Sequence, residues 1–169
     1  MTQGNTQTLR TTNTYAMAVT ALMTAVTCIL APLSIPLPFS PVPISLTNLV
    51  IFISVFILGM KDATISFLIY LLLGAVGLPV FASFHAGLSV LAGPTGGYLI
   101  GFIFLALIQG FAMKYFDRKL IPTIIGMLIG MAVCYIFGTV WLAKLMSLSF
   151  KEGLFMGVIP YLPGDAVKI

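Results

Sequence analysis

Charged residues are scarce in this chain: they make up 7% of its 169 residues, whereas 60% are hydrophobic. An ordinary soluble domain is roughly 25% charged and about half apolar. The shortage of charge therefore excludes a water-soluble globular protein. The abundance of apolar residues, reflected in a mean hydropathy of +1.14, excludes an intrinsically disordered chain.

Cysteine and histidine are equally rare. Two cysteines cannot build a disulfide scaffold or a four-cysteine zinc site, and both lie in apolar runs where they act as small fillers. The single histidine, His85, has no second histidine or cysteine nearby in the sequence. A Ser/His/Asp set, a Cys/His set and paired carboxylates are also missing. The sequence predicts a protein without catalytic residues, metal or cofactor.

The few cations stand at the ends of segments, so the net charge of +4 does not form the basic patch that nucleic acid requires. Between them lie long uncharged stretches, and a helix that crosses a bilayer needs about 20 mostly apolar residues. We expect an all-α integral membrane protein with spans at residues 15–33, 44–60, 63–81, 98–113 and 121–143. The polar residues 1–14 form a tail, and residues 15–169 form the transmembrane domain.

The turns between these spans have distinct compositions. The first, PLSIPLPFSPVP, is rich in proline and should be extended and stiff. The second is only Lys61-Asp62, which predicts a tight hairpin. Lysine and arginine prefer the cytoplasmic side, and the larger group of them places the N-terminus inside. That group comprises Arg10, Lys61, Lys114, Arg118 and Lys119, against Lys144, Lys151 and Lys168 on the outer side.

The C-terminal segment changes character. Residues 150–161 are too short and too interrupted by glycine and proline to span. The sequence PYLPGDAVKI is typical of a helix start, with proline and an acid in the first turn. We expect a sixth span that begins here and is cut short at Ile169, as in a partial sequence.

Asp165 and Lys168 lie three residues apart and share one helix face. Two interpretations are open: an ion pair at the membrane interface, or an acceptor and a cation presented to a polar ligand. His85 is either an ordinary loop residue or a ligand contact from a lid. The sequence GPTGGY lacks the lysine and the spacing of a P-loop, so it predicts a helix start at which backbone donors can meet a ligand.

Small residues recur at a spacing of four and allow close helix packing or docking of another membrane protein. The pairs are Ala21 and Ala25, Gly97 and Gly101, and Gly126 and Gly130.

Four segments, in order, resemble the BioY-type biotin transport proteins, the substrate-binding S components of energy-coupling-factor (ECF) transporters. They are PLPFSPVPISL, SFLIYLLLGAVGLPVFA, LAGPTGGYLIGF and PYLPGDAVKI. The resemblance implies a bundle of six transmembrane helices with both termini in the cytoplasm. It implies high-affinity biotin binding near the outer face and uptake with a transmembrane coupling protein and two cytoplasmic ATPases.

The resemblance also implies roles for particular residues. Ala21 and Ala25 match the docking motif of the family's first helix. Thr47 and Asn48 stand where the family usually has a glutamine. The candidate ligand-binding residues are Asp165, Lys168, His85, Ser83, Phe84, Thr95, Tyr98, Thr47 and Asn48.

Three other functions stay open on the residues alone: an S component for another water-soluble vitamin, an assembly protein that uses its small-residue faces, and a secondary transporter that acts alone. Lys168 beside Asp165 favours a ligand with a carboxylate or a mixed polar head. An assembly protein has no need of that pair, and a lone transporter is expected to show internal repeats.

Overall fold

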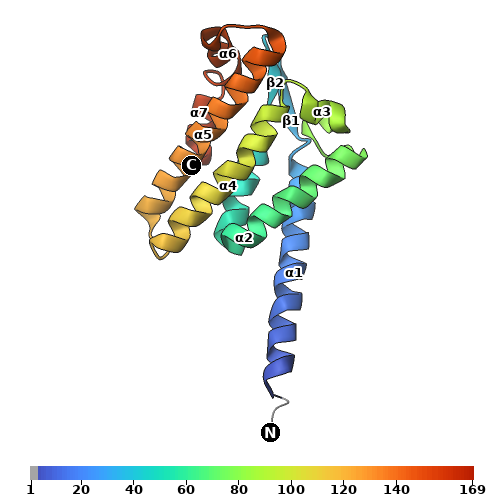
Figure 1. Cartoon of the computed structure of the whole chain (residues 1–169), viewed down its shortest axis with the longest axis vertical. Helices are drawn as coiled ribbons and strands as arrows, with labels where there is room; N and C mark the ends of the chain where they lie inside the picture. Colours follow the sequence, from blue (N-terminus) through green and yellow to red (C-terminus); the bar gives the residue numbers. More distant parts are fainter. Residues whose placement is uncertain (1–3) are drawn as a thin grey trace.

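A computed structural model describes residues 4–169, with side chains from Thr14 onward. The chain is a helical bundle with a small hairpin at the end farthest from the N-terminus (Figure 1). In chain order the elements are α1 (Gly4–Leu30), β1 (Ser34–Leu37), β2 (Ser40–Ser45), α2 (Thr47–Val76), the 3₁₀ turn η1 (Ala82–Phe84), α3 (Leu88–Ala92), α4 (Gly96–Tyr115), α5 (Leu120–Met146), α6 (Phe150–Gly157) and α7 (Leu162–Lys168).

Three of these helices, α2, α4 and α5, are long and apolar enough to cross a membrane, and α1 contributes a shorter apolar stretch, Thr14–Leu30. The prediction of a helical membrane protein is confirmed. The first span ends three residues earlier than expected, because Pro32 follows closely. At its other end α1 reaches back to Gly4. The tail assigned to residues 1–14 is thus largely helical, and residues 1–3 lie outside the described residues.

Helix α2 covers most of two expected spans, residues 44–60 and 63–81, but begins at Thr47 and ends at Val76, where Gly77 caps it. Its sharp break lies at Gly59 instead of at Lys61-Asp62. Gly59 has φ 79° and ψ 178°, a conformation that glycine adopts without the steric penalty of a side chain. The break separates α2 into two arms, residues 47–58 and 60–76, that point in different directions (Figure 1). The guanidinium of Arg118 donates to the Phe56 carbonyl, 3.3 Å away, one of the carbonyls near this broken end.

The proline-rich segment is extended, as expected, and in addition it pairs with itself. Strands β1 and β2 form a two-stranded antiparallel hairpin in which Ser34 faces Ser45 and Ile35 faces Ile44. A two-stranded hairpin leaves one edge of each strand free of ladder bonds, so prolines are tolerated there. The hairpin lies at the same end of the molecule as α3 and α6 (Figure 1).

Helices α4 and α5 pack side by side through their small residues. A Cβ at Gly97 would lie 2.3 Å from the Cβ of Trp141, and a Cβ at Gly101 would lie 2.9 Å from the Cys134 sulfur. These glycines, two of the small residues at a spacing of four, therefore serve internal helix packing. Cys134 is buried at this contact.

Helix α1 packs against α2 through a row of hydroxyl side chains. Thr20, Thr24 and Thr27 are buried, and the Thr24 hydroxyl lies 2.9 Å from that of Ser66 on α2. Ala21 and Ala25, on a neighbouring face of α1, are exposed. The expected small-residue pair is therefore not used for packing within the described bundle.

Helix α6 is short, as expected for a segment that does not span. Ser149 and Glu152 form a capping box at its start, in which each side chain accepts from the other residue's backbone N–H. The backbone and side-chain hydrogen bonds from Ser149 hold the pKa of the Glu152 carboxyl below its usual value. After α6 the chain turns back and α7 begins at Leu162, close to the expected start of the last helix.

Candidate ligand-binding site

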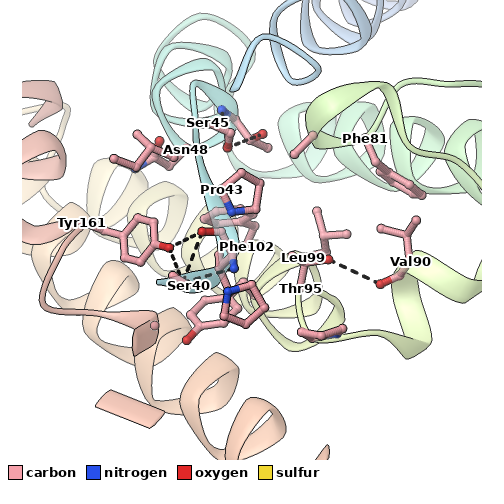
Figure 2. A pocket seen from close by; sticks show the side chains of 18 of the residues that line it. Ser40, Pro43, Ser45, Asn48, Phe81, Val90, Thr95, Leu99, Phe102 and Tyr161 are labelled. Carbon is pink, nitrogen blue, oxygen red and sulfur yellow. Dashed lines mark hydrogen bonds between the residues drawn. The ribbon is translucent and has the colours of Figure 1, made fainter. Parts of the chain in front are cut away.

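A cavity of about 450 Å³ lies beneath the hairpin. Its walls come from the hairpin, the start of α2, the segment from Phe81 to Thr95, helices α4 and α5, and the C-terminal segment. The inner walls are mostly apolar, with Phe81, Val90, Leu99 and Phe102 among them (Figure 2). An apolar cavity of this size with a few polar groups is typical of a small-molecule site.

The polar end of the cavity is built around Asp165, which is 8% exposed. Its Oδ1 accepts a hydrogen bond from Asn48 Nδ2 at 2.7 Å and pairs with Lys168 Nζ at 2.9 Å. Its Oδ2 accepts from the hydroxyl of Tyr135. One carboxylate thus joins α2, α5 and α7, and its burial is tolerated because each oxygen has a donor.

Lys168 has no spare donor in this arrangement. Its ammonium donates to the Ser45 carbonyl at 2.8 Å, to Asn48 Oδ1 at 3.0 Å and to Asp165 Oδ1 at 2.9 Å. An ammonium has three N–H donors, so all of them are used. A ligand acceptor that contacts Lys168 must therefore replace one of these partners.

Tyr161, just before α7, attaches the C-terminal segment to the hairpin. Its hydroxyl donates to the Val42 carbonyl and lies 2.7 Å from the Ser40 hydroxyl. Figure 2 shows the Tyr161 side chain directed at Ser40 across the edge of the cavity. With Lys168 bonded to Ser45, the C-terminal segment holds β2 at two places.

The structure brings eight of the nine candidate residues to the cavity wall: Asp165, Lys168, His85, Ser83, Thr95, Tyr98, Thr47 and Asn48. Phe84 is the exception, because its side chain is 63% exposed and lies outside the lining. Phe84 therefore does not line the cavity.

The candidate residues differ in their partners. Ser83 is held by Ser34, His85 places Nδ1 2.9 Å from the Ala82 carbonyl, and the Thr47 hydroxyl accepts from Ser45 at 3.0 Å. Of the nine, only Asn48, Asp165 and Lys168 bond directly to one another. We call these three residues the polar cluster.

Several lining residues carry no signal in the sequence. Tyr135 lies in the apolar run MAVCYIF, and nothing there indicates that its hydroxyl meets Asp165. Ser40, Ser45 and Tyr161 reach the site only because the hairpin folds over the C-terminal segment. Cys134 also lines the cavity.

Similarity to known proteins agrees with this architecture. The chain is 30% identical over 160 residues to biotin transporter BioY2 of Lactococcus lactis subsp. cremoris, which covers 95% of this chain and 87% of that protein. It is 35% identical over 165 residues to biotin transporter BioY of Rhizobium etli, covering 92% and 88%.

One solved structure, of the S component for biotin from an ECF-type ABC transporter, superposes with a TM-score of 0.85. It is 31% identical in sequence and covers 98% of this chain and 88% of its own. The two proteins are therefore similar in sequence as well as in fold. The BioY family model matches residues 3–169, nearly the whole chain. On these grounds the chain belongs to the BioY family.

Proposed function

We propose that this chain binds biotin in the cavity beneath the hairpin and serves as the substrate-specific subunit for its uptake. The observation that carries the proposal is the Asp165–Lys168 ion pair at the polar end of a mostly apolar cavity, in a member of the BioY family. Both relatives described above are named biotin transporters.

The chemistry of biotin suits the two kinds of wall. Its ureido ring has two N–H donors and a carbonyl, its thioether bicycle and tail are apolar, and its tail ends in a carboxylate. Asp165 is an acceptor for such polar groups, and Lys168 is a donor to them once one of its three present partners is replaced. Phe81, Leu99 and Phe102 offer apolar surface. Thiamine, which is cationic, is disfavoured by Lys168 beside the only carboxylate in the lining.

The subunit is proposed to act by binding alone. The described residues contain no group of three or more metal-binding side chains, and the cavity lining holds no nucleophile paired with a base. ATP hydrolysis is assigned to two cytoplasmic ATPases, which act through a transmembrane coupling protein. Ala21 and Ala25, exposed on α1, are the proposed docking positions because small residues let a partner helix approach closely.

The proposed orientation places the N-terminus in the cytoplasm and the cavity near the extracellular face. Lys61 follows the break in α2, and Arg118 contacts the same region from the α4–α5 turn. This end of the bundle carries the larger basic group, which favours the cytoplasmic side. The hairpin and α6 lie at the opposite end (Figure 1).

The test is calorimetric titration of biotin into the detergent-purified protein, with thiamine and riboflavin as controls. We expect saturable binding of biotin at about one site per chain and no heat from the controls. A folded sample that binds thiamine or riboflavin in place of biotin would assign another vitamin. A folded sample that binds none of the three would contradict the transport function.

A further inference from the structure

Tyr135 lies on α5, in the apolar run MAVCYIF, and contacts the polar cluster from there. Its hydroxyl donates to Oδ2 of Asp165, whereas Asn48 and Lys168 both bond to Oδ1. Among the described residues, Tyr135 is the one hydrogen-bond donor to Oδ2. The two oxygens of the carboxylate are therefore held by different parts of the fold.

The ring of Tyr135 is itself firmly placed. It packs against both apolar clusters of the molecule, one that includes Leu99 and Met131 and one that includes Tyr98 and Leu142. Core packing therefore helps to place its hydroxyl. Close packing restricts a side chain to one rotamer.

Helix α7, which carries Asp165, lacks such support. It makes few backbone contacts with the other described elements. The terminal torsion of an aspartate is also broad, so the carboxylate turns easily unless both oxygens are held.

We propose that Tyr135 is a positioning residue for ligand binding: its hydroxyl fixes Oδ2 of Asp165 and so sets the plane in which the carboxylate meets a ligand donor. The proposal rests on the proposed biotin-binding function of the same cavity. Tyr135 acts through Asp165, and its contribution to affinity disappears when the carboxylate is removed.

The first arm of the test is a double-mutant cycle with equilibrium binding of radiolabelled biotin. Tyr135→Phe keeps the ring and removes the hydroxyl, and we expect affinity to fall about tenfold, the size of one hydrogen bond to a charged group. On an Asp165→Ala background the same change should alter affinity by less than about twofold, because no carboxylate remains to be held.

Tyr161→Phe is the matched control for this cycle. It also removes one phenolic hydroxyl from the cavity, but its partners are Val42 and Ser40 and not Asp165. Its effect on affinity should be the same on both backgrounds. Equal losses from Tyr135→Phe on both backgrounds would mean that Tyr135 acts independently of Asp165, which would overturn the proposal, as would unchanged affinity in Tyr135→Phe.

The second arm needs no ligand, so it separates this proposal from the biotin assignment. Hydrogen exchange of the α7 amides is measured in the unliganded protein, with Tyr115→Phe, an exposed tyrosine on α4, as the control. We expect Tyr135→Phe and Asp165→Ala each to accelerate exchange, with no further increase in the double variant. Exchange at the wild-type rate in Tyr135→Phe would overturn the positioning role. Acceleration in a protein that binds no biotin would refute only the biotin assignment.

Discussion

Ser34 on β1 and Ser83 on η1, 49 positions apart, share a hydroxyl–hydroxyl hydrogen bond of 2.9 Å, and the Ser34 hydroxyl also accepts from the Ser83 backbone N–H at 2.8 Å. Ser83 and Phe84 have φ values of 57° and 60°, which are uncommon for residues with side chains. The two hydrogen bonds therefore hold η1, with its uncommon backbone conformation, against the hairpin beside the cavity.

Removing this fastening should loosen residues 82–86. In Ser34→Ala we expect their amides to exchange about five- to tenfold faster, since a lost hydrogen bond is worth about 1 kcal/mol. The measurement is hydrogen exchange with mass spectrometry. Ser54→Ala, which removes a hydroxyl bonded within α2, is the control and should leave this segment unchanged. Wild-type exchange in Ser34→Ala would mean that packing alone holds η1.

Asp165→Asn should weaken biotin binding by one to two decades. The substitution removes the negative charge that Lys168 pairs with at 2.9 Å and places an amide where a donor is expected. A hydrogen bond to a charged group is worth on the order of 1.5–3 kcal/mol, which corresponds to that loss. Calorimetry on the folded variant measures it, and an unchanged affinity would remove Asp165 from the site.

Ala21→Leu should leave biotin binding intact and prevent assembly with the coupling protein. Ala21 is exposed on α1, away from the cavity, so added bulk affects only a helix that docks there. Co-purification with the coupling protein and the ATPases is the measurement. Ala132→Leu, an exposed alanine on α5, is the control and should assemble normally. Normal assembly of Ala21→Leu would argue against α1 as the docking face.

Gly138→Ala should destabilise the bundle, because a Cβ at this position would lie 2.3 Å from the ring of Tyr98. Overpacking of this kind costs about 1–3 kcal/mol and displaces the side chain it meets. We expect a lower unfolding temperature in detergent and weaker biotin binding, since Tyr98 lines the cavity. Gly164→Ala, with open space at its Cβ, is the control. An unchanged unfolding temperature would show that Tyr98 yields freely.

The capping box of α6 should make its stability depend on pH. The folded pKa of Glu152 is lowered by its bonds from Ser149, so the stabilisation is present above the ordinary pKa of about 4.3 and is lost as the pH falls through the lowered value. Exchange of the α6 amides should therefore quicken at acid pH, once the intrinsic pH dependence of exchange is corrected for. Glu152→Gln should remove this dependence, whereas Asp117→Asn in the α4–α5 turn should retain it. A dependence that survives in Glu152→Gln would assign it to another group.

The approximate positions of the spans could be predicted because charge is excluded from lipid. Lys114 and Lys144 lie in the last turns of α4 and α5, and Lys61 lies two residues after the break in α2. The sharing of a face by Asp165 and Lys168 follows from helical spacing and is confirmed by their ion pair. The break lies at Gly59 and not at the charged pair Lys61-Asp62, because glycine adopts the positive φ that the sharp change of direction requires.

The remaining contacts join residues far apart in sequence. Asn48 and Asp165 are separated by 117 positions and Tyr135 and Asp165 by 30. In an apolar run every face of the helix is similarly hydrophobic, so composition does not reveal that Tyr135 faces inward. The pairing of β1 with β2 is equally hidden, because a proline-rich segment predicts an extended chain and not its partner.

The break at Gly59 also sets the length of the first arm of α2. Asn48 precedes the break on a helical arm that rises 1.5 Å per residue, so it lies about 16 Å from the break along the helix axis. The hydrocarbon layer of a bilayer is about 30 Å thick. Along this arm, about half of that thickness therefore separates Asn48 from the break.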